Sequence, residues 1–356
     1  MFRLIFAAVT ALTVLPAGAA EFNAQVDGII TGYIRPATAG FAEATARLPG
    51  AVEEVCVQPG PEPEERFRKA FSQTVDAFSR VHFLRFGPLI DNDRLSRLAF
   101  LPDPRGIAQR QLRKINAAQD DGVLSVEMLA QKSVAVQGLT ALELIAFDKG
   151  AGVELGKQST DKAFTCGYAL AIARNVAAIA ENLAADWANQ DGYSAVLMSA
   201  GPDNDRFRTS KEALESLFNS LVTGLIIARD QDVLPALGSS PDKVRPNRFP
   251  FSRSANSVVF LSGELEGIEN ALNSLGLKPL TPEDFGWIFD TLAFEFGNAR
   301  SLLQALDPPL RETFSEGDYD RVNVLAITLK SIRDTMALEL AGALELAGGF
   351  NALDGD

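Results

Sequence analysis

The sequence predicts an all-α protein built from two helical bundles. Along most of the 356 residues, apolar residues recur with the period of an amphipathic helix, among good helix formers. Alternating β-branched stretches, which are typical of strands, are nearly absent. The number of helices and their short connections indicate about four helices in each bundle. The expected helices span approximately residues 23–48, 62–86, 105–117, 123–148, 160–190, 208–231, 254–275, 281–306 and 318–347.

Residues 1–20 are excluded from the fold because they have the pattern of a signal peptide. Arg3 provides a positive start, residues 4–15 form an apolar run, and small residues precede a cleavage point after Ala19 or Ala20. No cysteine stands at that point, so we do not expect a lipid anchor. No later segment has about 18 consecutive apolar residues. We therefore predict a periplasmic protein whose mature chain has no transmembrane segment.

Several predicted helices have clear boundary signals. Prolines and a glycine at 59–63 break the chain before the second helix, and "TPE" at 281–283 is typical of a helix start. The polar segment "SAGPDNDRF" at 199–207 lies near the midpoint and is rich in turn formers. The chain is also longer than one hydrophobic core usually serves. These features predict an N-terminal bundle at 21–200 and a C-terminal bundle at 201–356.

The charge and cysteine content limit the possible partners and chemistry. A net charge of −13 disfavours nucleic acid and anionic membrane surfaces as partners. Cys56 and Cys166 are the only cysteines, and in an oxidising compartment one disulfide is the simplest outcome; two buried thiols are the alternative. Catalytic cysteine chemistry is disfavoured because His82 is the only histidine. We interpret His82 itself as a structural group, since a lone histidine in a helix is more often structural than a ligand.

Two long segments without helical periodicity remain, at 86–106 and 238–254. Loops of this length in compact proteins are commonly functional. The basic residues of the second segment predict an anion-attracting patch, although the segment could equally neutralise acidic neighbours at the domain junction. Its basic residues are Lys243, Arg245, Arg248 and Arg253.

The segment "VQGLTALELIAF" at 136–147 places a carboxylate on an apolar helix face. Glu143 shares that face with Leu139, Leu142 and Ala146, because positions three and four apart lie on one side of a helix. A buried carboxylate needs partners or a raised pKa. The candidate partners are the Thr140 hydroxyl one turn earlier and the guanidinium groups of Arg85, Arg105 and Arg253.

The same segment resembles the Gly-x-His-x-x-Glu motif of the imelysin-like family. In "GLTALE" at 138–143, Gly138 and Glu143 are in register and Thr140 stands where the family has histidine. Further segments resemble the exported branch of that family: "FLRFGPL" at 83–89, "FLPDPRG" at 100–106, the helix at 166–183, "LFNSLVTGL" at 217–225 and "RFPFSRSANS" at 248–257.

The resemblance implies a fold and a location for the site. Imelysin-like proteins are periplasmic or envelope-associated, have two related helical-bundle domains, and include relatives linked to iron uptake and relatives described as metallopeptidases. Their site lies between the domains, near the motif helix. Gly138 is expected to allow a close backbone approach or a helix kink. We accordingly predict an interdomain pocket formed by Gly138, Thr140, Glu143, Arg85, Arg105, Arg253 and Ser254.

Thr140 changes the chemistry that this pocket can support. A zinc hydrolase ordinarily has three protein ligands, and threonine cannot replace an imidazole. Peptidase activity is therefore disfavoured, while oxygen ligands including Glu143 could hold iron or another divalent or trivalent ion. We predict a non-catalytic binding or accessory protein in metal acquisition, with a metal ion or iron-containing ligand and other envelope iron-uptake proteins as partners. The alternatives are a metallopeptidase and a scaffold in which a Glu143 ion pair only fixes the domain junction.

Overall fold

The computed structural model describes residues 22–347, so the predicted signal peptide at 1–20 lies outside the described residues. Within 22–347 the secondary structure is helical, and the only β-type pairing is an isolated bridge between Phe147 and Val153. The all-α prediction is confirmed.

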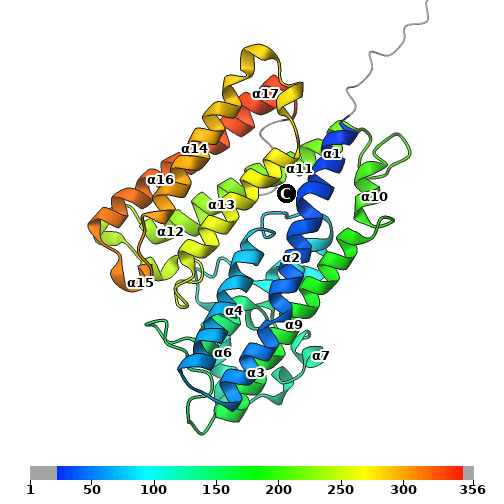
Figure 1. The fold of residues 1–356 in the computed structure, drawn as a ribbon. Helices are drawn as coiled ribbons and strands as arrows, with labels where there is room; N and C mark the ends of the chain where they lie inside the picture. Colours follow the sequence, from blue (N-terminus) through cyan, green and yellow to red (C-terminus); the bar gives the residue numbers. More distant parts are fainter. Residues whose placement is uncertain (1–21, 348–356) are drawn as a thin grey trace, which may run out of the picture.

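The first group of helices contains the N-terminal half of the chain (Figure 1). Its long first helix is interrupted by one π-helical turn, and the disulfide Cys56–Cys166 joins the helix at Leu48–Val57 to the helix at Lys162–Ala188, which confirms the predicted bridge. Buried phenylalanines such as Phe41, Phe67 and Phe71 fill the space between these helices. The group comprises α1 (Asn23–Ile29), the π turn Ile30–Ile34, α2 (Arg35–Ala46), α3 (Leu48–Val57), α4 (Pro61–Ser79) and α9 (Lys162–Ala188).

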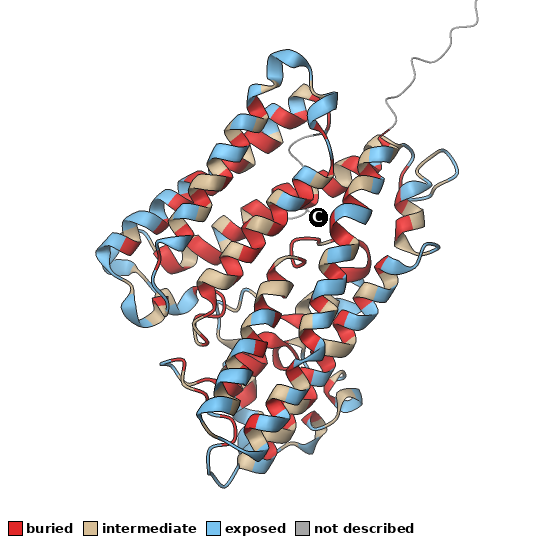
Figure 2. Ribbon diagram, viewed as in Figure 1, coloured by how far each residue is buried: buried red, intermediate tan, exposed pale blue. Residues whose placement is uncertain are grey.

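The second group contains the C-terminal half and packs as a second set of long helices (Figure 1). Two of these helices continue through π-helical turns, at Ala228–Val233 and Thr335–Leu340. Figure 2 shows exposed residues along the outer helices α14 and α16, as an amphipathic pattern requires, whereas α11 is buried or half-buried along nearly all of its length. The group comprises α11 (Ser210–Ile227), α12 (Leu234–Leu237), α13 (Ser257–Ser274), α14 (Trp287–Gln304), α15 (Leu310–Thr313), α16 (Glu316–Asp334) and α17 (Ala341–Ala343).

The two groups meet mainly along α4 and α13, and the hydrophobic core is continuous across this contact. Gly263 makes the close approach possible, because a Cβ atom there would lie 2.1 Å from Oγ of Ser79. The predicted domain boundary falls between α10 (Tyr193–Met198) and α11. Independent domains at 21–200 and 201–356 stay a prediction.

Some predicted helix boundaries were wrong. The second predicted helix ends at Ser79 rather than at 86, and the predicted helix 123–148 consists of short pieces. The side chains of Ser125 and Ser133 accept hydrogen bonds from backbone N–H groups two or three residues later, which begins new turns and interrupts the apolar period. The shorter helices of this half are α5 (Arg94–Leu98), α6 (Ile107–Ala118), α7 (Val126–Leu129) and α8 (Leu139–Ala146).

One stretch of the described chain, Lys162–Met198, is long and apolar enough to cross a membrane by length and composition alone. Its most apolar window is 56% buried inside the protein. The stretch begins with α9, which packs against α2 and α3, so its apolar character is accounted for by the core.

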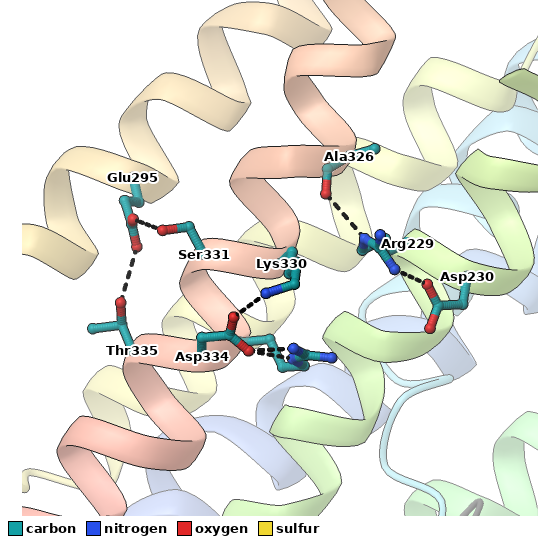
Figure 3. A network of polar contacts seen from close by, with 9 residues as sticks. Arg229, Asp230, Glu295, Ala326, Lys330, Ser331, Asp334 and Thr335 are labelled. Carbon is teal, nitrogen blue, oxygen red and sulfur yellow. Dashed lines mark hydrogen bonds and ion pairs between the residues drawn. The ribbon is translucent and has the colours of Figure 1, made fainter. Parts of the chain in front are cut away.

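A polar network holds the π turn Ala228–Val233 and the end of α16 in place (Figure 3). Nε of Arg229 donates to the carbonyl oxygen of Ala326 at 3.2 Å, and the carboxylate of Glu295 accepts hydrogen bonds from Ser331 and Thr335. The Arg229 bond ties the segment that carries Asp230 and Asp232 to α16, and both of these residues reach the cavity described next.

Candidate functional site

A cavity of about 760 Å³ lies between the two groups of helices. One wall comes from the N-terminal half, through the loop at 100–106, the first turn of α6, and the residues Thr140, Glu143 and Leu144 of α8. The other comes from the C-terminal half, through residues at 230–235 and 247–253. The volume is in the range of small-molecule binding sites.

Gly138 positions α8 against the segment that leads into this cavity. It is the N-cap of α8, and a Cβ atom there would lie 2.3 Å from the carbonyl oxygen of Leu98 and 2.4 Å from that of Arg97. Only glycine permits this approach. The contact is the expected close backbone approach, and because Gly138 precedes the helix it produces no kink.

Thr140 also anchors that segment. Its Oγ1 accepts a hydrogen bond from the backbone N–H of Phe100 at 3.1 Å. This contact ties the cavity loop to α8. The hydrogen bond that we expected from Thr140 to Glu143 is not among the contacts of the described residues.

Glu143 is buried, with 7% of its surface exposed, and its partner is a serine of the other half. Oε1 accepts hydrogen bonds from the backbone N–H of Ser254 at 2.9 Å and from its Oγ at 2.8 Å. Burial raises the pKa of Glu143, and the two bonds from Ser254 together with the charge of Arg253 oppose this shift. The side-chain amide of Asn256 in turn donates to Oγ of Ser254 at 3.0 Å.

The three predicted arginines have different positions. Arg253 lines the cavity, and its Nη1 donates to the carbonyl oxygen of Phe147 at 3.2 Å rather than forming an ion pair with Glu143. Arg105 is exposed and does not line the cavity. Arg85 does not line it either; its charge interacts with two other buried carboxylates.

The cavity wall carries several cations that form no ion pair. Burial and the nearby charge of Arg311 lower the pKa of Arg253, and the charges of Glu143 and Asp148 partly offset this shift, so the two guanidinium groups repel each other while the carboxylates attract Arg253. Sequence reasoning missed Lys149 and Arg311, because nothing local marks them. Of the predicted basic patch, Arg248 and Arg253 line the cavity, and Lys243 and Arg245 do not. Within residues 22–347 no ion pair is formed by Lys149, Arg248, Arg253 or Arg311.

A second polar cluster lies beside the cavity, around His82. Nε2 of His82 is 3.4 Å from Oε1 of Glu264, a side chain with no exposed surface. Burial lowers the pKa of His82 to about 3, and the charge of Arg85 acts in the same direction. Burial raises the pKa of Glu264 and of Asp232, and Arg85 partly offsets both shifts.

Sequence reasoning did not find this cluster, although a signal was present. Glu264 is spaced four residues from Phe260 and four from Ile268 on the apolar face of α13, the same kind of pattern that identified Glu143. Asp232 gave no comparable signal, because it stood just beyond the end of a predicted helix.

Comparisons with known proteins agree on the family. The family model described as Imelysin (peptidase M75) matches residues 31–334. The crystal structure of an imelysin-like protein from Psychrobacter arcticum 273-4 has a TM-score of 0.77 at 19% identity, over 92% of this chain and 97% of that one. A structure from Parabacteroides distasonis ATCC 8503, described as an iron-regulated protein A precursor, has a TM-score of 0.72 at 13% identity, with the same coverage of 92% and 97%. Among curated proteins none matches this sequence. Because the family model covers most of the sequence, the chain belongs to the imelysin family.

Proposed function

We propose that this protein is a non-catalytic, exported binding component of iron acquisition that takes up an anionic iron chelate in the cavity between its two halves. The observation that carries the proposal is the pair Arg253 and Arg311. Both guanidinium groups line one cavity, they repel each other, and neither forms an ion pair with a carboxylate within 22–347, although the charges of Glu143 and Asp148 attract Arg253. An anion placed between them would relieve this repulsion.

The rest of the wall suits an oxygen-rich ligand. A guanidinium group matches a carboxylate with two parallel hydrogen bonds, and ferric iron prefers oxygen ligands, so chelates of ferric iron by carboxylates fit both requirements. Apolar residues such as Phe249 and Phe251 supply the remaining surface. Glu143 is the protein carboxylate that we propose as an additional metal ligand, since it belongs to the cavity wall. Iron as the metal is supported by the family and by the iron-regulated description of one structural neighbour.

A metallopeptidase is the less favoured function. Among the residues that line the cavity there is no histidine, and the oxygen of Thr140 is already hydrogen-bonded to the N–H of Phe100. A zinc hydrolase needs three protein ligands and an open position for water.

A structural role is a second candidate, and one contact favours it. The bonds from Ser254 to Glu143 connect α8 to the segment before α13. They would hold the two halves together whether or not a ligand binds.

Titration calorimetry of the mature protein with ferric citrate tests the proposal. Arg253→Gln and Arg311→Gln are each expected to weaken binding roughly 10- to 100-fold, the effect of losing one charged hydrogen bond. Arg105→Gln is the matched control, because Arg105 is exposed and outside the cavity wall, and it should bind as the wild type does.

Equal binding by all three variants, or no binding by the wild type, would refute the cavity as a chelate site. Glu143→Gln distinguishes a binding role from a structural role for this carboxylate. Lower stability with unchanged binding of ferric citrate favours the structural role. Digestion of casein by the protein, if a chelator abolishes it, would refute the proposal that the protein is non-catalytic.

A further inference from the structure

The only histidine of the chain lies beside two carboxylates from distant parts of the sequence. His82 follows α4, Asp232 lies in the π turn after α11, and Glu264 is in the middle of α13. We propose that these three side chains form a binding site for a divalent first-row transition metal ion. The site uses none of the residues assigned to the chelate, so it stands independently of the proposed function.

The geometry is that of a set of ligands around one ion. The three side chains offer one ligand atom each, and these atoms all lie within 4.8 Å of one another. Nε2 of His82 and Oε1 of Glu264 are 3.4 Å apart. Two ligands that bind one ion at about 2.1 Å and at a tetrahedral angle are separated by roughly 3.4 Å.

The unpaired atoms of the cluster are the second observation. All three residues are buried, yet both carboxylate oxygens of Glu264 and Oδ2 of Asp232 have no hydrogen-bond partner. Buried acceptors without partners are rare and costly in folded proteins. A cation among them would satisfy these acceptors at once.

The charges of the cluster leave room for an ion. Arg85 interacts electrostatically with both Glu264 and Asp232 and supplies one positive charge against their two negative charges. The net charge of the cluster is about −1 when both carboxylates are ionised. A bound divalent ion would make this net charge about +1, so the amount of uncompensated buried charge would not increase. The competing arrangement is a proton shared between the two carboxylates, which engages two of the three unpaired oxygens and leaves the third without a partner.

The ligand types indicate the class of metal. One imidazole nitrogen and two carboxylates favour ions such as Zn²⁺, Fe²⁺, Mn²⁺ or Co²⁺ over Ca²⁺ and Mg²⁺, which prefer oxygen alone. Asp232 also belongs to the cavity wall, which gives such an ion a route from solvent.

Cobalt binding by untagged mature protein, stripped of metal with EDTA, tests this site. We expect one equivalent of Co²⁺ with the intense visible bands of low coordination number, and a higher Tm when Zn²⁺ is added. Glu264→Gln and Asp232→Asn should each weaken binding at least about 100-fold, more than loss of a residue that only supports a ligand. Glu266→Gln, the same substitution on the same helix but at a half-exposed residue paired with Arg80, should leave binding unchanged.

The controls make each outcome decisive. Circular dichroism verifies that the variants fold. If Glu264→Gln does not fold, the proposal is tested by the Co²⁺ titration of Asp232→Asn and by the Tm shift of the wild type. No Co²⁺ binding and no Tm shift in the wild type would overturn the proposal in favour of the shared proton. Binding that survives both substitutions would overturn it by placing the ion elsewhere.

Discussion

Replacing Glu264 by glutamine is expected to destabilise the protein at acidic pH and to stabilise it at neutral pH. Glu264 has no exposed surface and lies beside Asp232, and burial, followed by that neighbouring charge, raises its pKa well above the ordinary value of 4.5. In the metal-free folded protein the carboxyl group therefore keeps its proton at pH values where the unfolded chain has lost it. Glutamine has nearly the same shape and does not titrate.

The sign and size follow from proton linkage. Because the folded pKa is raised, the stabilising contribution of Glu264 is fully present below pH 4.5 and is lost as the pH rises toward the folded pKa. The loss is about 1.4 kcal/mol per pH unit for one proton, which gives at most about 4 kcal/mol between pH 4.5 and about pH 7.5. A buried amide without partners costs about 1 to 3 kcal/mol at every pH. The variant should thus be less stable than the wild type near pH 4.5 and more stable near pH 7.5.

Urea unfolding followed by circular dichroism in EDTA, at several pH values, measures this difference. The depressed pKa of His82 makes both proteins less stable as the pH falls below 6.5, so it largely cancels in the comparison. Glu266→Gln on the same helix is the matched control: it removes a half-exposed carboxylate paired with Arg80, so it should not make the protein more stable than the wild type near pH 7.5. A difference between wild type and Glu264→Gln that stays constant from acidic to neutral pH would refute a buried, protonated Glu264.

Two further predictions concern the framework around the site. Gly138→Ala should destabilise the protein by about 1 to 3 kcal/mol or more, because the new Cβ atom would lie 2.3 Å from a backbone oxygen; an unchanged Tm would contradict the close approach. The double substitution Cys56→Ser with Cys166→Ser should lower the free energy of unfolding by about 4 to 5 kcal/mol, since the bridge closes a loop of 110 residues. An unchanged urea midpoint for that variant would contradict a stabilising disulfide.

The sequence by itself determined the features that depend on local spacing. The helical period predicted the all-α fold, and the position of Glu143 among Leu139 and Leu142 predicted that its carboxylate is buried. Composition, together with the expected oxidising compartment, predicted the disulfide. The same local method failed where short-range hydrogen bonds from Ser125 and Ser133 interrupt an apolar period that otherwise continues.

Only the tertiary structure decided which distant residues meet. Glu143 receives its hydrogen bonds from Ser254, 111 residues away, and not from the neighbouring Thr140. The approach of Arg311 to Arg253, and of Asp232 to Glu264, likewise has no trace in local spacing. The periodicity of a helix specifies which face turns inward, but the angle and register at which two helices pack decide which side chains on those faces come into contact.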